Sequence, residues 1–236
     1  MTILSTLVAA AALLLVVGNP LLYRREMVEL GTAIQNFRYA VYLGLAAMAL
    51  SLISGGLAFR KKSGRGQLLA AAGLIAGFVA FWSPYSQDRT AQRLPFIHDI
   101  TTDIENPPVF DAVLPLREGM NSVAYDPAVG AEQRAAYPDI QPLVLDVPPG
   151  EAFSRALATA EGLGWEIVAQ DAGAGLIEAT DTTFWMGFKD DVVIRLRPEG
   201  AGTRVDVRSV SRVGRSDIGV NAARIAVYLG ELEAGG

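Results

Sequence analysis

Hydrophobic residues are concentrated in the first third of this chain, where three long runs contain no charged residue. The runs cover about residues 2–22, 39–59 and 67–82. A helix of about 20 apolar residues spans the roughly 30 Å hydrocarbon core of a bilayer. We therefore predict a membrane region over residues 1–85 with three transmembrane helices, and a lipid bilayer as a partner of the chain.

The first run has no basic residues before it and no clear small-residue cleavage site after it, so we predict an uncleaved span rather than a signal peptide. The polar segment 26–38 either lies along the membrane interface or begins the second helix. Because the three runs hold no ionisable residue, the pattern disfavours transporters and proton relays.

Small residues recur at four-residue spacing in two of the runs, at Ala47, Ser51 and Gly55 and again at Gly73 and Gly77. This spacing allows close helix packing, although general richness in Ala and Gly would also produce it. Assembly of a homo-oligomer through the membrane helices, at Gly73 and Gly77, is a further hypothesis.

Loop charge predicts the orientation in the membrane. Four cations lie between the second and third runs, at Arg60, Lys61, Lys62 and Arg65, whereas the preceding loop carries Arg24, Arg25 and Arg38. Cytoplasmic loops are the ones richer in Lys and Arg. We predict that loop 60–65 and the N-terminus are cytoplasmic, and that the soluble part lies on the outer, periplasmic side of the membrane.

After a linker at residues 86–95, short alternating runs separated by Gly and Pro predict a soluble domain over residues 96–233. Strands are expected near 143–147, 165–169, 176–183, 191–197 and 204–213, with one helix after Gly150 and another from Ile218. This order predicts an α+β domain, an antiparallel sheet with both helices on one face. The opposite face is expected to be open, and residues 111–137 to be an irregular surface excursion.

The last two strands predict a hairpin across the turn-forming sequence PEGAG. If Arg195 lies opposite Asp206, then Ile194 faces Val207 on the apolar side, and Leu196 faces Val205. Shifting the register by one residue would bury the arginines without partners, which the cost of desolvating a charge forbids.

The polar side of this hairpin is a candidate site for an anionic small molecule, a lipid headgroup or an acidic envelope protein, because guanidinium groups match phosphate and carboxylate geometry. The first hypothesis for the function is therefore a non-enzymatic, membrane-anchored module of the cell envelope that binds such a partner. Ser216 or Asp217 is expected to cap the final helix, whose N-terminus would add backbone donors. The candidate ligand-binding residues are Lys189, Arg195, Arg197, Arg208, Arg212, Ser216, Asn221 and Arg224. The alternative is a solvated sheet face with ordinary ion pairs, formed with acids such as Glu178.

Charge and composition exclude several other functions. From Ser86 onward the chain has thirteen basic and twenty-three acidic residues, so general nucleic-acid binding is disfavoured. The chain contains no Cys and a single His, and its scattered acids Asp99, Asp103 and Glu105 make a poor metal site with His98. We expect no metal and no cofactor.

An enzyme remains the second hypothesis for the function. A hydrolase or transferase would use Lys189, Asp190, Asp191 and Asp217, with His98 as a further acid or base. It requires a concave pocket that joins His98 to the two adjacent aspartates. No catalytic residue is assigned on this basis, because no nucleophile-elbow pattern occurs in the chain.

Several stretches of the soluble part resemble one known family, in the order HDITTDIENPP, AYPDIQPL, GW-E-I, IEATDTT, GFKDDVVIRLRP and VDVRSVSRVGRSDIGVNAARI. These motifs resemble the bacterial domain-of-unknown-function family 1499 from about residue 94 to residue 225. The resemblance implies a membrane-associated or exported bacterial domain without an established activity. It implies no catalytic residues, because the family has none assigned.

Overall fold

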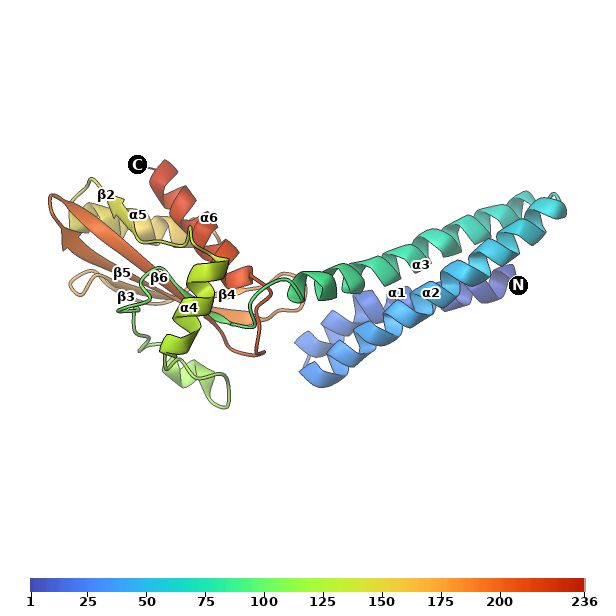
Figure 1. Ribbon diagram of the computed structural model, residues 1–236, viewed down its shortest axis with the longest axis horizontal. Coiled ribbons are helices and arrows are strands. Elements are labelled where there is room, and N and C mark those ends of the chain that lie inside the picture. Colours follow the sequence, from blue (N-terminus) through green and yellow to red (C-terminus); the bar gives the residue numbers. More distant parts are fainter. Residues whose placement is uncertain (236) are drawn as a thin grey trace. The chain divides into compact units, whose positions relative to one another are not determined.

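The computed structural model describes residues 1–235, and the chain forms two compact units. The first unit comprises Met1–Gln92 together with Trp185–Gly187. The second comprises Arg93–Phe184 and the chain from Phe188 onward. The units are described separately below, as the helical unit and the soluble unit (Figure 1).

Three helices make up the helical unit: α1 (Thr2–Arg24), α2 (Leu30–Arg60) and α3 (Gly64–Ala91). Each is long and apolar enough to cross a membrane. The predicted three-helix region is therefore confirmed. Helix α2 begins before its apolar run, so segment 30–38 belongs to it. Helix α3 continues past Pro84, because hydropathy reports the length of apolar sequence and not the length of the helix.

Small residues bring α2 and α3 into close contact within one chain. A Cβ on Gly44 would lie 2.7 Å from the carbonyl oxygen of Gly77, and a Cβ on Gly73 would lie 2.5 Å from Oγ of Ser51. Only residues without a larger side chain permit this approach. Gly73 and Gly77 are thus buried against α2 within one chain, and assembly of a homo-oligomer through the membrane helices stays a prediction.

Polar side chains also join α1 to α2. Asn19 Nδ2 donates to the carbonyl of Ala33 at 2.8 Å, and Asn36 Nδ2 donates to Asn19 Oδ1 at 3.0 Å. Ser5 and Ser54 place their Oγ atoms 3.3 Å apart. Side-chain amides and hydroxyls are preferred partners between helices in an apolar medium.

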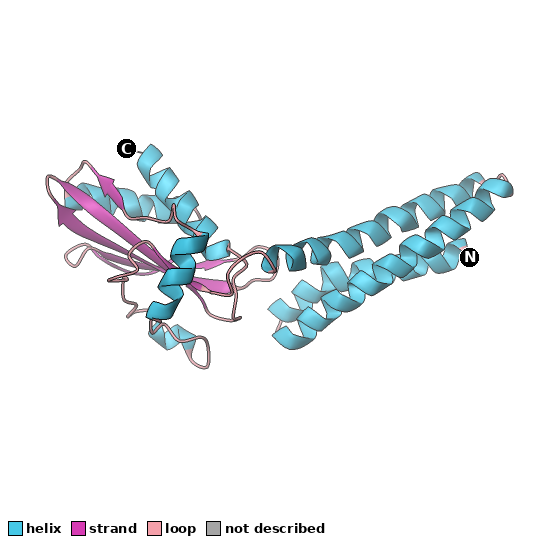
Figure 2. Ribbon diagram, viewed as in Figure 1, coloured by secondary structure: helices cyan, strands magenta, loops and turns pink. Residues whose placement is uncertain are grey.

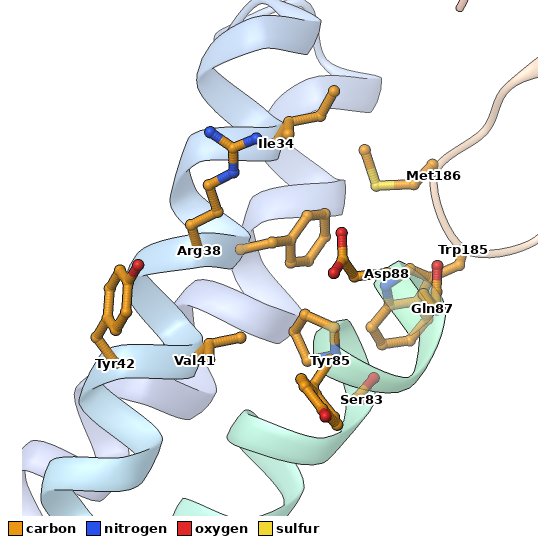
Figure 3. A pocket seen from close by; sticks show the side chains of 12 residues that line it. Ile34, Arg38, Val41, Tyr42, Ser83, Tyr85, Gln87, Asp88, Trp185 and Met186 are labelled. Carbon is orange, nitrogen blue, oxygen red and sulfur yellow. The ribbon is translucent and has the colours of Figure 1, made fainter. Parts of the chain in front are cut away.

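Figure 3 shows side chains of α2 and α3 around a pocket at the more polar ends of these helices. Ile34, Arg38 and Tyr42 come from α2, whereas Ser83, Tyr85 and Asp88 come from α3. Aromatic and charged side chains together are typical of the membrane–water boundary.

The soluble unit contains one antiparallel sheet, drawn in magenta in Figure 2. Its strand order is β1-β6-β5-β4-β3, and β2 also pairs with β6. The strands are β1 (Asp99–Thr101), β2 (Leu143–Leu145), β3 (Glu166–Asp171), β4 (Leu176–Thr182), β5 (Lys189–Glu199) and β6 (Gly202–Ser211). Helices α5 (Pro149–Gly162) and α6 (Val220–Ala234) pack on one face of the sheet (Figure 1). The predicted fold class is confirmed.

The predicted hairpin register is also confirmed. Arg195 pairs with Asp206, Ile194 with Val207 and Leu196 with Val205. Ile194, Val205 and Val207 are fully buried in the core beneath the two helices. The alternation of apolar and charged residues therefore specified both the pairing and the face.

Helix α6 packs on the core through Tyr228, which is fully buried, stacks on Trp165 with ring centroids 5.0 Å apart, and donates its hydroxyl to the carbonyl of Ala156. The helix was predicted to begin at Ile218, but it begins at Val220, and Ile218 keeps 36% of its surface exposed. Asp217 accepts hydrogen bonds from the backbone N–H groups of Gly219 and Asn221, which fixes the start of the helix at this point.

The second face of the sheet is covered, and the prediction that it is open is wrong. Residues 103–126, here called the roof segment, cross this face and contain the short 3₁₀ helix η1 (Leu114–Arg117). Phe110 and Val113 of the roof segment form a second core with Val193 and Val210 of the sheet. Apolar residues at these strand positions required cover that the pattern of the roof segment did not reveal.

The excursion predicted over residues 111–137 also contains regular structure. Helix α4 (Pro127–Ala136) begins with Asp126, whose side chain accepts from the backbone of Ala128. Gln133 of α4 is buried and exchanges two hydrogen bonds with the backbone of Thr101. The Asp-Pro start was a recognisable helix signal in the sequence.

Candidate functional site

The polar residues of the sheet form ion-pair networks on both of its faces. On the roof side, Asp191 is fully buried and lies at the centre of the first network. Its carboxylate accepts from Arg117 Nη1 at 2.5 Å, from Arg212 Nη2 at 2.8 Å and from the Thr180 hydroxyl at 2.7 Å. Two guanidinium groups, one from the roof segment and one from the residue that follows β6, thus share one carboxylate.

These contacts determine the protonation of Asp191. Burial raises the pKa of this carboxyl, but hydrogen bonds from Arg212, Thr180 and Arg117 outweigh burial, so its pKa lies below the ordinary value. The group is therefore an ionised ion-pair partner, and a proton donor or acceptor near neutral pH is not expected of it.

A second cluster lies at the hairpin end of the same face. Asp206 is fully buried and accepts from Arg195 at 3.0 Å, from Arg197 at 2.7 Å and from Arg204 at 2.9 Å. Asp103 of the roof segment faces the same three arginines at 3.2–3.4 Å. The side chains of Arg197 and Arg204 remain 39% and 28% exposed, so this cluster is the one that solvent reaches.

The guanidinium of Arg208 is surrounded by hydrogen-bond acceptors and aromatic rings of the protein. Its guanidinium donates to both carboxylate oxygens of Asp99, at 2.9 and 2.7 Å, and also to carbonyls of the roof segment. The rings of Phe110 and Tyr125 each lie 5.3 Å from its Cζ atom. Only 2% of Arg208 is exposed, so it is an internal cation and not a surface one.

Arg224 belongs to the opposite, helix-covered face. It donates to Asp190 at 2.6 Å and to Asp181 at 2.8 Å, and it also contacts Asn221 and the Ser209 hydroxyl. Asn221 in turn donates to the carbonyl of His98 and to the Ser211 hydroxyl. This second network joins α6 to the sheet.

Backbone contacts pin the roof segment as well. Glu178 of β4 accepts from the consecutive N–H groups of Asp111, Ala112 and Val113 at 2.8–3.0 Å. Asn121 donates to the carbonyls of Ser211 and Gly214. Glu178 therefore serves the roof segment rather than the arginines to which the sequence had linked it.

The candidate residues therefore separate into four groups. Arg208, Arg212, Asn221 and Arg224 are buried and partnered, so their assignment to an open ligand surface is corrected; Ser216 bonds the backbone of Ile218 locally. Arg195 and Arg197 lie in the partly exposed cluster. Lys189 is exposed at the start of β5. The structure brings most of these residues together, but as internal partners.

The aspartates of the enzyme hypothesis are also engaged in contacts within the protein. Asp190 and Asp191 are buried on opposite faces of β5, each within an arginine network. Asp217 holds the start of α6, and burial raises its pKa. Within residues 1–235, no group of three or more His, Cys, Asp or Glu side chains is arranged to hold a metal ion.

Sequence reasoning missed several residues that organise these networks, notably Arg117, Asp99 and Asp103. Arg117 stands alone in the apolar stretch LPLR, and nothing in that pattern links it to a strand 74 residues later. Asp99 and Asp103 were weighed as metal ligands and not as partners of the arginines. The predicted strand face carried more arginines than acids. This excess was the available signal that acidic residues from other parts of the chain must form ion pairs with these arginines.

Comparisons with known proteins add family membership. No curated protein matches the chain. One similar solved structure is described as the crystal structure of TTHA0849 from Thermus thermophilus; it is 16% identical, with 39% of this chain and 92% of that chain covered and a TM-score of 0.25. At these values the likeness assigns no function.

A family model described as "Protein of unknown function (DUF1499)" matches residues 99–232, which include all six strands, α5, most of α6 and the networks described above. The match spans more than half of the chain, and it agrees with the resemblance seen in the sequence motifs. The chain therefore belongs to the DUF1499 family.

Proposed function

We propose that this chain is a non-enzymatic protein of the bacterial cell envelope, in which three inner-membrane helices hold a soluble DUF1499 domain at the bilayer. The observation that carries this proposal is the combination of three apolar helices with a domain whose buried charges are satisfied by one another. The first feature supports anchoring, and the second supports a structural rather than a catalytic role for those charges.

Anchoring is tested by extracting membranes that contain the full chain with alkaline carbonate. A chain held by three spans stays in the pellet, because each span buries about 20 apolar residues in lipid. Recovery of the full chain in the supernatant would refute anchoring.

The proposed orientation places the soluble unit in the periplasm. Loop 60–65 supports it, because four cations in six residues favour the cytoplasm. A fluorescent reporter fused after Gly236 that matures only in the cytoplasm should stay dark, whereas a periplasmic phosphatase reporter at the same position should be active. The opposite pair of results would reverse the orientation.

The alternative, an enzyme built on Lys189, Asp190 and Asp191, finds less support. A catalytic acid or base must reach its substrate within hydrogen-bonding distance. Asp190 and Asp191 are 3% and 0% exposed, and their carboxylates are bound by Arg224, Arg117 and Arg212. Substrate access to either carboxylate would require the network around it to open.

Within the cluster at the hairpin end, the guanidinium groups most accessible to an anionic ligand are those of Arg197 and Arg204. A polar pocket of about 260 Å³ is lined by Arg204, Arg134 and Gln141, together with the acids Asp103 and Glu105. We propose this hairpin end as the place where a small anion binds. Titration with inorganic phosphate should perturb the NMR signals of Arg197 and Arg204 in the full chain, and R197Q should weaken the effect. An equal response in R155Q, which lies elsewhere, would argue against the site.

A further inference from the structure

Three cations of the soluble unit lack an acidic partner. Its other arginines each lie within 4.0 Å of an acid, at positions 117, 134, 155, 195, 197, 204, 208, 212 and 224. In the described part of this unit, Arg93, Lys189 and Arg215 have no such pair, and all three are exposed. This is unexpected in a domain in which acids greatly outnumber bases.

The three cations lie at one end of the sheet. Strand β5 begins with Lys189, and its neighbour Asp190 pairs with Ser211 at the end of β6. Arg215 follows four residues after Ser211. Strand β1 begins at Asp99, opposite Val210, and Arg93 precedes it by six residues. The register therefore brings to one edge the segments that carry these charges.

Apolar side chains are exposed at the same end. Phe96, Phe184 and Ile218 keep 63%, 89% and 36% of their surfaces exposed. The guanidinium of Arg215 lies over the ring of Phe96, with its Cζ atom 5.2 Å from the ring centroid. Exposed aromatic groups together with unpaired cations are typical of surfaces that bind the headgroup region of a bilayer.

The soluble unit has another exposed apolar patch, whose surrounding charges differ from those at the basic end of the sheet. Leu114, Leu116 and Met120 of the roof segment are also exposed. This patch is bordered by the exposed acids Asp111 and Glu118, and the cation within it, Arg117, is buried against Asp191. An anionic surface would repel the roof patch and attract the basic end of the sheet.

The covalent connection favours the same end. Residues 92–96 lead from the end of α3 to Phe96, and five extended residues span at most about 18 Å. The linker therefore restricts how far Phe96 can move from the end of a helix that is anchored in lipid. Ile218 adds a local feature, because it is a non-glycine residue with φ of 55°, which presents its side chain from a strained turn.

We propose that this basic and aromatic end, formed by Arg93, Phe96, Lys189, Arg215 and Ile218, docks on the anionic headgroup surface of the bilayer that anchors the chain. Docking limits the orientations of the domain over the membrane and exposes its opposite, hairpin end to the aqueous phase. The inference rests on the proposed anchoring, and it adds a lipid-recognition surface distinct from the arginine networks.

The test uses the full chain in lipid nanodiscs. The chain contains no Cys, so Val220→Cys, at the 40% exposed first residue of α6, accepts a single environment-sensitive fluorophore. Nitroxide-headgroup lipids should quench this probe in discs of phosphatidylcholine with phosphatidylglycerol. Quenching should weaken in pure phosphatidylcholine and at high salt, because screening reduces the attraction between exposed charges.

Two matched double variants separate specific docking from bulk charge. K189Q/R215Q removes two unpaired cations of the docking end, and each basic residue near an anionic surface changes binding by about 5-fold, so the docked-to-undocked ratio should fall roughly 25-fold. R134Q/R155Q also removes two positive charges, but from exposed ion pairs elsewhere in the domain. This control variant should quench like the parent chain.

The outcomes distinguish the inference from the proposal beneath it. If the chain co-elutes with the discs but quenching is absent, is equal in both lipids, or falls equally in the two double variants, the docking surface is refuted while anchoring stands. If the chain does not enter the discs, anchoring itself fails, and the inference fails with it.

Discussion

Replacing Asp191 with Asn should destabilise the soluble unit more than any surface substitution. The carboxylate is fully buried and is shared by Arg117 and Arg212, whose side chains are 4% and 7% exposed. Asn keeps the shape of the side chain but removes its charge. Both guanidinium groups then remain buried without the anion that offset their desolvation.

The expected magnitude follows from this burial. Removing one partner of a buried ion pair costs about 3–5 kcal/mol. Here one carboxylate serves two cations, but Arg117 keeps carbonyl acceptors at Val210, Asn121 and Ser211, which limits the loss. For a domain of this size, we expect the melting temperature to fall by about 10–15 °C.

Thermal unfolding of the full chain in detergent, followed by the β-sheet circular dichroism signal, measures this loss. Limited proteolysis adds a local readout, because D191N should expose the roof segment, which Arg117 fastens to the sheet. The control is E105Q, which removes the acid of the exposed Arg134 pair and should cost less than about 1 kcal/mol. If D191N and E105Q melt together and the roof segment stays protected, the network does not stabilise the domain.

Three further predictions concern other parts of the chain. The pKa of Asp191 is lowered in the folded state, so its contribution to stability is complete above its ordinary pKa of 3.8. This contribution is lost as the pH falls through the lower pKa of the folded state. The urea midpoint should therefore decline more steeply in acid for the parent chain than for D191N. G44L should prevent the helical unit from packing, because a Cβ there meets the Gly77 carbonyl at 2.7 Å, whereas G56L in the same helix has open space and should behave like the parent chain in size-exclusion chromatography. Y228F should cost about 1 kcal/mol in thermal unfolding by removing the hydrogen bond to the Ala156 carbonyl, and an unchanged melting temperature would show that this bond is not stabilising.

Local pattern was sufficient for much of this architecture. Three uncharged runs predicted three membrane-length helices, because a bilayer requires about 20 apolar residues regardless of what else the chain does. In the final hairpin, alternation placed Ile194 and Val207 opposite each other, because a shift of one residue would have exchanged the buried and charged faces. Motifs spread over the soluble part were enough to identify the family.

The covered face could not be predicted in the same way. The sequence predicted that its arginines form an open surface, because several of their ion-pair partners lie far away in the sequence. Asp99 is 109 residues from Arg208, and Asp191 is 74 residues from Arg117. A strand pattern reports which side chains share a face, but not which distant segment packs on that face.

The functional proposals also combine what the local sequence shows with what only the folded structure shows. Uninterrupted apolar runs identified the three helices that are long and apolar enough to cross a membrane, because this property depends on local composition. The folded structure showed which charges are already partnered, because ion pairing depends on segments that meet only in three dimensions. Once those pairs are removed from consideration, Lys189 and Arg215 stand out as exposed cations, and that distinction was invisible among the twenty basic residues of the sequence.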